Sequence, residues 1–223
     1  MTHKTIIFWV LVSVIVACGE KKQPAASNQD ELDLAREYHY RDSTLYGACG
    51  EGSAMNSLQL ITDNGDTLLL STIAAQDNNR LFGGYEIGDR MAVIADADKT
   101  KALTVINLNT LMGEWVMPNP LDGSSYSGFN IKDGGIMESI NQSAVIYKTW
   151  QIENGRLTLV SVREGGGDFT ELESFDISYL TNDSLALRGS EEIFEYNRPG
   201  KMENYDDLIT DDDDDVAYDD IVI

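Results

Sequence analysis

Histidine and cysteine are scarce in this sequence, where each occurs only twice among 223 residues. Two cysteines can form at most one disulfide, which excludes the disulfide framework typical of small secreted domains. The same scarcity excludes zinc sites built from histidine and cysteine, and we predict no metal site. A Ser-His-Asp or Cys-His catalytic arrangement would have to recruit one of very few side chains. Catalysis is therefore not the expected function.

Basic residues are also few, since 16 lysines and arginines face 38 acids and give a net charge of −22. Phosphates would be repelled, which excludes nucleic acid as a partner. Adsorption on anionic lipid is disfavoured for the same reason. Many of the acids lie in residues 203–223, which contain no base. Consecutive aspartates at 211–215 repel one another, so we predict that residues 200–223 form a disordered acidic tail.

Long hydrophobic segments are lacking, and the longest apolar run extends only from Ile6 to Val16. A helix that spans a bilayer needs about 20 apolar residues. The run follows Lys4, as in the hydrophobic region of a signal peptide. It ends in Ile15-Val16-Ala17-Cys18, which resembles the lipobox of bacterial lipoproteins. The alternative is an uncleaved signal anchor that carries a chance cysteine.

The lipobox resemblance implies that residues 1–17 are a signal peptide and that Cys18 becomes the first residue, carrying a diacylglyceryl group and an acylated amino group. Two or three chains suffice for stable anchoring, because each buried CH₂ contributes about 0.8 kcal/mol. We expect the protein in the bacterial cell envelope. Gly19 is not the aspartate that retains such proteins at the inner membrane. This favours the periplasmic face of the outer membrane, with surface display as the alternative.

Cleavage would leave His39 as the single histidine and Cys49 as the single unmodified cysteine. His39 falls in residues 18–42, a polar segment that we predict to be a tether. Cys49 is expected to be a buried and unreactive thiol. No cofactor is predicted.

Residues 43–108 contain short apolar runs separated by turns. Strands are predicted at Ser57–Thr62 and Thr67–Ile73, on either side of Asp63-Asn64-Gly65-Asp66, a hairpin signal. Further strands are expected at Tyr85–Asp96 and Ala102–Leu108. Short and sharply bent strands favour a small closed barrel of the OB type, with an SH3-like barrel as the alternative.

Residues 109–199 contain a second and longer series of strands. The turn at Asn154-Gly155 fits a two-residue type I′ hairpin. Eight consecutive strands with tight turns predict an up-and-down antiparallel barrel. The fold class is therefore all-β, with two small antiparallel barrels. The expected strands are 111–117, 128–132, 135–141, 144–153, 156–162, 170–180, 184–188 and 192–196.

The second series begins with Gly113-Glu114-Trp115, a Gly-x-Trp motif that resembles the opening of lipocalins. The segments around Phe129, Asp133-Gly134-Gly135 and Tyr147-Lys148-Thr149-Trp150 extend the resemblance. Together they look like the small lipocalin-like domains common in lipoproteins of Bacteroides-type gut bacteria. The resemblance covers roughly residues 109–199. It implies a barrel that Trp115 closes at one end and a glycine that allows close backbone approach, and it supplies no substrate.

The segment around Cys49, Tyr46 to Gly52, looks like the companion domain that often precedes this barrel. The pairing is similar to an envelope-stress lipoprotein linked to copper resistance. The domain order here is reversed and the CxxC motif of that protein is missing. A copper role is therefore not inferred.

Four aromatic side chains are candidates for lining a ligand cavity: Trp115, Phe129, Tyr147 and Trp150. Phe169 is a further candidate, although the same aromatic residues could simply fill a narrow barrel. We predict a non-enzymatic, lipid-anchored protein that binds a small apolar ligand or a segment of an envelope protein. One alternative is an interaction or assembly module without a small ligand, whose acidic tail engages a basic partner. The other is a hydrolase that uses carboxylates alone.

Overall fold

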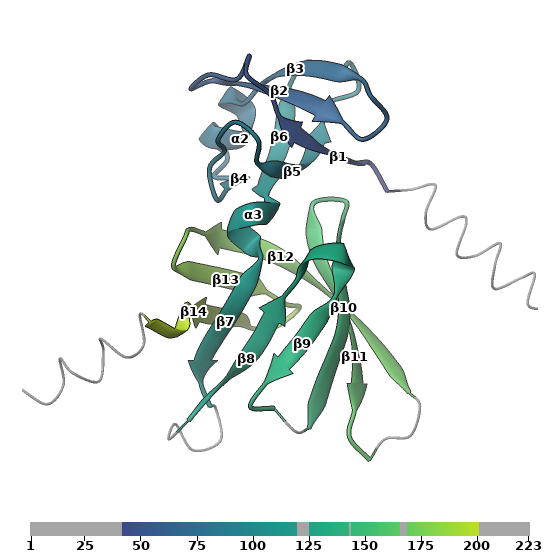
Figure 1. Ribbon diagram of the computed structural model, residues 1–223, viewed down its shortest axis with the longest axis vertical. Helices are drawn as coiled ribbons and strands as arrows, with labels where there is room; N and C mark the ends of the chain where they lie inside the picture. Colours follow the sequence, from purple (N-terminus) through teal and green to yellow (C-terminus); the bar gives the residue numbers. More distant parts are fainter. Residues whose placement is uncertain (1–41, 120–124, 143, 166–168, 201–223) are drawn as a thin grey trace, which may run out of the picture. The chain divides into compact units, whose positions relative to one another are not determined.

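The computed structural model describes residues 42–119, 125–142, 144–165 and 169–200. Most of these residues lie in strands, which confirms the all-β class (Figure 1). Within this part of the chain, no helix combines the length and the apolar character that crossing a membrane would need. The predicted signal peptide, Cys18, His39 and the acidic tail lie outside the described residues, so the structure does not bear on them.

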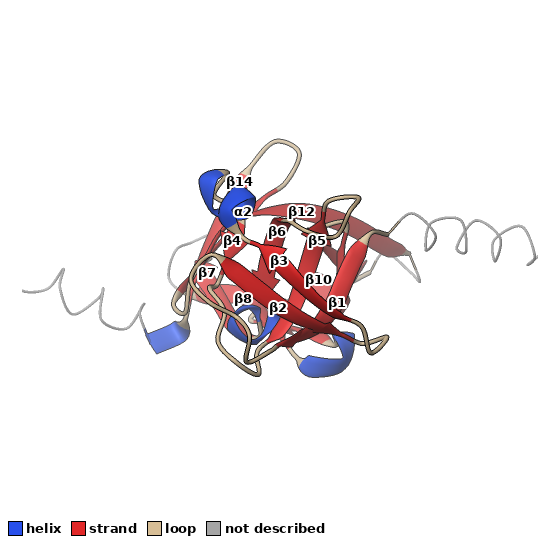
Figure 2. Ribbon diagram, turned by 90° about the horizontal axis from the view of Figure 1, so that it is seen from above, coloured by secondary structure: helices blue, strands red, loops and turns tan. Residues whose placement is uncertain are grey.

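The first strand series forms one six-stranded sheet in the order β3-β2-β1-β5-β6-β4. A parallel bridge between Ser71 and Lys101 links the end of β3 to the start of β6 and brings the two sides of the sheet together. The result is a small barrel-like sheet (Figure 2). Its strands are β1 (Thr44–Cys49), β2 (Ser57–Thr62), β3 (Thr67–Ser71), β4 (Leu81–Phe82), β5 (Arg90–Ala95) and β6 (Ala102–Asn107).

The inner face of this sheet follows from the two-residue period of a strand. In β2, Leu58 and Leu60 are buried, whereas Ile61 between Leu60 and Thr62 is exposed. The core continues with Cys49, which is buried as predicted. The similarity to an OB barrel stays a prediction.

Two elements of this sheet were not predicted. A short helix, α2 (Ile73–Asp77), follows β3, although Ile73 was expected to end a strand. The short strand β4 pairs with β6 in parallel, so the prediction of purely antiparallel pairing is wrong at this edge. The expected strand at Tyr85–Asp96 also begins later, at Arg90, because Gly88 takes a left-handed conformation with a φ of 92°.

The second series forms an eight-stranded antiparallel sheet in the order β10-β11-β12-β13-β14-β7-β8-β9. This order is a cyclic permutation of the chain order, so consecutive strands are neighbours, as the up-and-down prediction requires. A helical turn, α3 (Leu108–Leu111), precedes it. The strands are β7 (Gly113–Pro118), β8 (Tyr126–Ile131), β9 (Met137–Ile140), β10 (Val145–Glu153), β11 (Arg156–Arg163), β12 (Thr170–Leu180), β13 (Ser184–Arg188) and β14 (Ile193–Asn197).

The sheet curls into a nearly closed barrel. β14 meets β7 at the pair Asn197 and Val116. At the seam between β9 and β10, the hydroxyl of Ser139 donates to the carbonyl oxygen of Val145 and accepts from the N–H of Tyr147, both at 2.8 Å. The side chain of Ser139 therefore links β9 to β10 at this seam.

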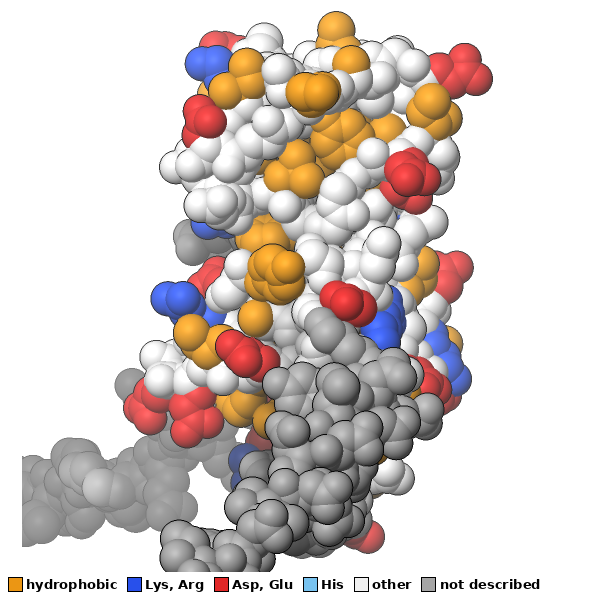
Figure 3. Space-filling view, turned by 90° about the vertical axis from the view of Figure 1, so that its left-hand side faces the viewer, with side chains coloured by type: hydrophobic (Ala, Val, Ile, Leu, Met, Phe, Trp, Pro, Cys, Tyr) orange, Lys and Arg blue, Asp and Glu red, His pale blue; other side chains and the backbone are white. Residues whose placement is uncertain are grey.

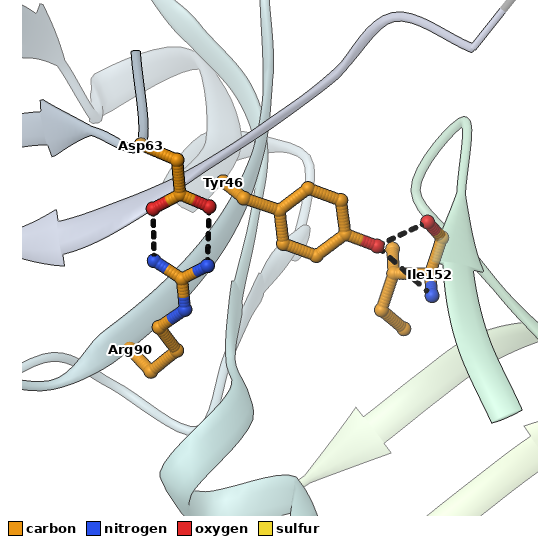
Figure 4. A network of polar contacts seen from close by, with 4 residues as sticks. All are labelled: Tyr46, Asp63, Arg90 and Ile152. Atoms are coloured by element: carbon orange, nitrogen blue, oxygen red, sulfur yellow. Dashed lines mark hydrogen bonds and ion pairs between the residues drawn. The ribbon is translucent and has the colours of Figure 1, made fainter. Parts of the chain in front are cut away.

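The two sheets share one hydrophobic cluster. Phe82, Ala92 and Ile106 of the first sheet are buried in the same cluster as Trp115 and Phe129 of the barrel. A polar link accompanies it, because the Tyr46 hydroxyl donates to the carbonyl oxygen of Ile152 at 2.5 Å (Figure 4). The same hydroxyl accepts from the N–H of Ile152 at 3.2 Å. Within the first sheet, an ion pair joins Arg90 to Asp63 beside this tyrosine.

Candidate functional site

One end of the barrel is closed by Trp115 of the Gly-x-Trp motif. Trp115 is fully buried, and its indole N–H donates to the carbonyl oxygen of Leu111. The guanidinium of Arg198, which follows β14, lies 3.7 Å from the centre of the Trp115 ring. Gly113 has a φ of 110°, and a Cβ there would lie 2.4 Å from the Arg198 guanidinium. The glycine therefore makes room for the arginine that covers the tryptophan.

The interior next to this end is filled with apolar side chains. Phe129 is fully buried on β8, opposite Trp115. Trp150 is also buried, and its indole N–H donates to the carbonyl oxygen of Lys132. Trp115, Phe129 and Trp150 therefore lie in the packed core of the structure, and Tyr147 is partly buried against it.

A pocket of about 550 Å³ opens at the other end of the barrel, away from Trp115. This size falls within the range typical of small-molecule sites. Four aromatic side chains line it, together with Glu173 and the turn at 189–192. We call it the lumen pocket. Its aromatic residues are Tyr147, Phe175, Phe194 and Tyr196.

The aromatic rings of the lumen pocket form contacts around Phe129. The ring of Tyr196 lies 4.8 Å from that of Phe129, and the ring of Tyr147 packs edge-on against it at 5.7 Å. Phe175 and Phe194 form a second edge-on pair at 6.1 Å. Phe129 thus separates the pocket from the filled part of the barrel.

One hydroxyl group on this interior face is buried without a hydrogen-bond partner among the described residues. The Ser161 side chain is 1% exposed and its Oγ is unpaired. Ser161 is directly opposite Tyr147 in the pairing of β10 with β11, so both side chains project from the same face of the sheet. The side chains of Tyr147 and Tyr196 line the lumen pocket beside it. Buried polar groups are normally paired, so the unpaired Ser161 hydroxyl is an exception to this rule.

Charged residues surround the pocket unevenly. Glu173 is paired opposite Leu159, on the inward face of β12. Arg156 at the rim donates through Nη2 to the carbonyl oxygen of Ser174, while its Nε lies 3.4 Å from a carboxylate oxygen of Asp176 without forming a hydrogen bond. The mouth of the pocket is therefore acidic.

Burial raises the pKa of Tyr147 to about 12, and the nearby charge of Glu173 adds to the effect. Burial likewise raises the pKa of Tyr46 to about 12 and raises that of Tyr196, with the charges of Tyr147 and Glu173 contributing. The folded state thus holds these three protons more tightly than the unfolded state.

We therefore expect stability to be complete below the ordinary tyrosine pKa of 10.0 and to fall as the pH rises through about 12. Urea unfolding across this range, followed together with tyrosinate absorbance, measures the effect. Tyr147→Phe should reduce the alkaline loss because one buried proton no longer titrates. If all tyrosines ionised together near pH 10.0 in a folded protein, the burial of these hydroxyls would be refuted.

A larger pocket of about 1230 Å³ lies outside the barrel and is lined by residues of both sheets. Figure 3, which views the side of α2 and β4, shows hydrophobic side chains exposed there. Several of its polar groups are already paired. Tyr85 donates to the carbonyl oxygen of Ala54, and Cys49 contacts the Ser53 hydroxyl at 3.2 Å. We favour the smaller lumen pocket because the buried, unpaired hydroxyl of Ser161 lies opposite the pocket residue Tyr147.

Other predicted candidates lie away from both pockets. Phe169 is 79% exposed just before β12. The carboxylate of Asp96 accepts hydrogen bonds from the N–H groups of Thr100 and Lys101, so it stabilises a turn. No group of three potential metal ligands occurs among the residues that the structure describes.

The comparisons with known proteins concern the barrel. A search of curated proteins found no match. A lipocalin-like protein from Bacteroides thetaiotaomicron, known from its crystal structure, is 29% identical and covers 40% of this chain and 95% of its own, with a TM-score of 0.36. Lipocalin-like folds are typically binding domains for small hydrophobic molecules, not enzymes. A family model described as lipocalin-like matches residues 107–199, the segment that runs from the end of β6 through all eight strands of the barrel.

Proposed function

We propose that the barrel binds a small amphipathic molecule in the lumen pocket, on a protein that lipid at Cys18 holds to a bacterial membrane. The observation that carries the proposal is the Ser161 hydroxyl, which is 1% exposed and unpaired and lies directly opposite the pocket residue Tyr147. Leaving such a group without a partner costs about 1–3 kcal/mol. A ligand that hydrogen-bonds Ser161 would offset this cost, and the surrounding aromatic rings would bury its apolar part.

Ser161→Ala separates a binding role from a structural role. We expect the variant to be as stable as the original protein or more stable, by up to about 1 kcal/mol, because it removes an unpaired buried hydroxyl. The same change should weaken binding of the ligand. Urea unfolding and native mass spectrometry of purified protein, before and after lipid extraction, measure the two effects.

Ser139→Ala is the matched control. Its hydroxyl makes two hydrogen bonds across the β9–β10 seam, so its loss should lower stability by about 1 kcal/mol or more. The proposal fails if Ser161→Ala is as destabilising as Ser139→Ala, and also if no molecule copurifies and no apolar probe enters the barrel.

Membrane attachment is a separate part of the proposal. It predicts that Cys18→Ser releases the protein from the membrane fraction, while a change at the buried Cys49 does not. The interaction module and the carboxylate-only hydrolase stay predictions. The acidic tail on which the former depends lies outside the described residues.

A further inference from the structure

The chemistry of the lumen pocket narrows the class of ligand. Glu173 projects from the inward face of β12, two residues before the pocket residue Phe175. Glu173 lines the pocket together with Tyr147 and Tyr196. One carboxylate and two hydroxyls can thus act on a common group there.

Two of the arginines near the pocket form ion pairs with carboxylates. Arg156 is paired with Asp176, and Arg163 is paired with Glu171 at 2.7 Å. The rim turn adds Glu191 and Glu192, which are exposed. An anionic head group would meet net negative charge here, whereas a cation would be attracted.

The pocket walls also suit a cation. Tyr147 and Tyr196 belong to the aromatic cluster around Phe129, while Phe175 and Phe194 form the opposite pair. The faces of aromatic rings attract ammonium groups by about 0.5–2 kcal/mol. Their hydrocarbon surface also buries the apolar part of an amphipathic molecule.

We propose that the lumen pocket binds an amphipathic primary amine in its protonated form. The ammonium group donates to the carboxylate of Glu173 and to the hydroxyls of Tyr147 and Tyr196, which all line the pocket, because an ammonium has three N–H donors and no acceptor. The alkyl part of the molecule packs against Phe175 and Phe194. This inference rests on the proposed binding function and adds the charge of the ligand to it.

Three probes of equal chain length test the charge: octylamine, octanol and octanoate, each titrated by calorimetry into the full-length protein. We expect octylamine to bind most tightly. Glu173→Gln keeps the shape of the side chain and removes its charge, so it should weaken octylamine binding by about tenfold. Binding of octanol should be unchanged by this substitution.

Glu195→Gln is the matched control. Glu195 is exposed on β14 between Phe194 and Tyr196, so it projects from the opposite face of the strand. This substitution should leave octylamine binding unchanged. An equal loss in both variants would point to general surface charge and would overturn the assignment to Glu173.

The outcomes also separate the two proposals. If octanol or octanoate binds in the pocket at least as tightly as octylamine, the amine inference is wrong while ligand binding by the barrel stands. If none of the three binds and NMR shows no perturbation of Tyr147 or Ser161, both proposals are wrong. A preference for octylamine that Glu173→Gln abolishes supports both.

Discussion

Gly128→Ala is expected to disrupt the barrel, with a loss of about 3 kcal/mol or more from the free energy of unfolding. Gly128 is paired with Val116 between β7 and β8. A Cβ at this position would lie 2.0 Å from the carbonyl oxygen of Trp115 and 2.9 Å from the Cα of Val116. Both contacts are with backbone, which cannot turn away as a flexible side chain would. Because domains are stable by only about 5–15 kcal/mol, the variant should be poorly folded. Circular dichroism and urea unfolding measure this.

Gly200→Ala is the control, since a Cβ there would meet nothing within 4 Å. It should change stability by less than about 0.5 kcal/mol. If Gly128→Ala were equally mild, the close approach of β7 and β8 would be wrong.

Arg198→Ala is expected to cost about 2–4 kcal/mol. The guanidinium donates to the carbonyl oxygens of Thr110, Met112 and Glu114 and covers the Trp115 ring. Removing it leaves those carbonyls unpaired and opens the closed end of the barrel. Burial lowers the pKa of Arg198, yet a guanidinium remains charged at any ordinary pH. Arg198→Lys should recover only part of the loss, because an ammonium lacks the planar fork that reaches several carbonyls.

Urea unfolding and tryptophan fluorescence measure the effect of Arg198, since solvent that reaches Trp115 shifts its emission to longer wavelength. Arg188→Ala, at the exposed end of β13, is the control and should change neither stability nor emission. Equal effects of the two substitutions would mean that Arg198 does not close the barrel.

Much of the barrel could be predicted from the sequence because local signals and the global fold agree there. The strands β12 and β13 begin and end where expected. At the turn between β10 and β11, Asn154 and Gly155 both have positive φ, at 50° and 74°, as a type I′ hairpin requires. The helix α2 was not predicted because it is short and no side chain caps its N-terminus, so the sequence carries no helix-start signal there.

The lumen pocket was harder to predict because bulges change which side chains face inward. The pairing of β10 shifts between Tyr147 and Thr149, and that of β12 shifts between Ile177 and Tyr179. Each bulge moves the inward positions by one residue. Tyr147 was a predicted site residue and does line the pocket, but Glu173 and Ser161 carry no local motif. Arg198 likewise belongs to no recognisable sequence motif, although Gly113 and Trp115 of the Gly-x-Trp motif lie where it packs.

The hydrophobic cluster shared by the two sheets has a consequence for how the protein is divided into parts. A boundary drawn after residue 108 separates two strand series, but it passes through packing that joins Phe82 and Ile106 to Trp115 and Phe129. Each barrel therefore covers apolar surface that the other barrel would otherwise expose to water. Recombination that swaps one barrel for a foreign one would leave an uncovered apolar face. Either half expressed alone would therefore expose part of this cluster, although the chain is divided into two strand series.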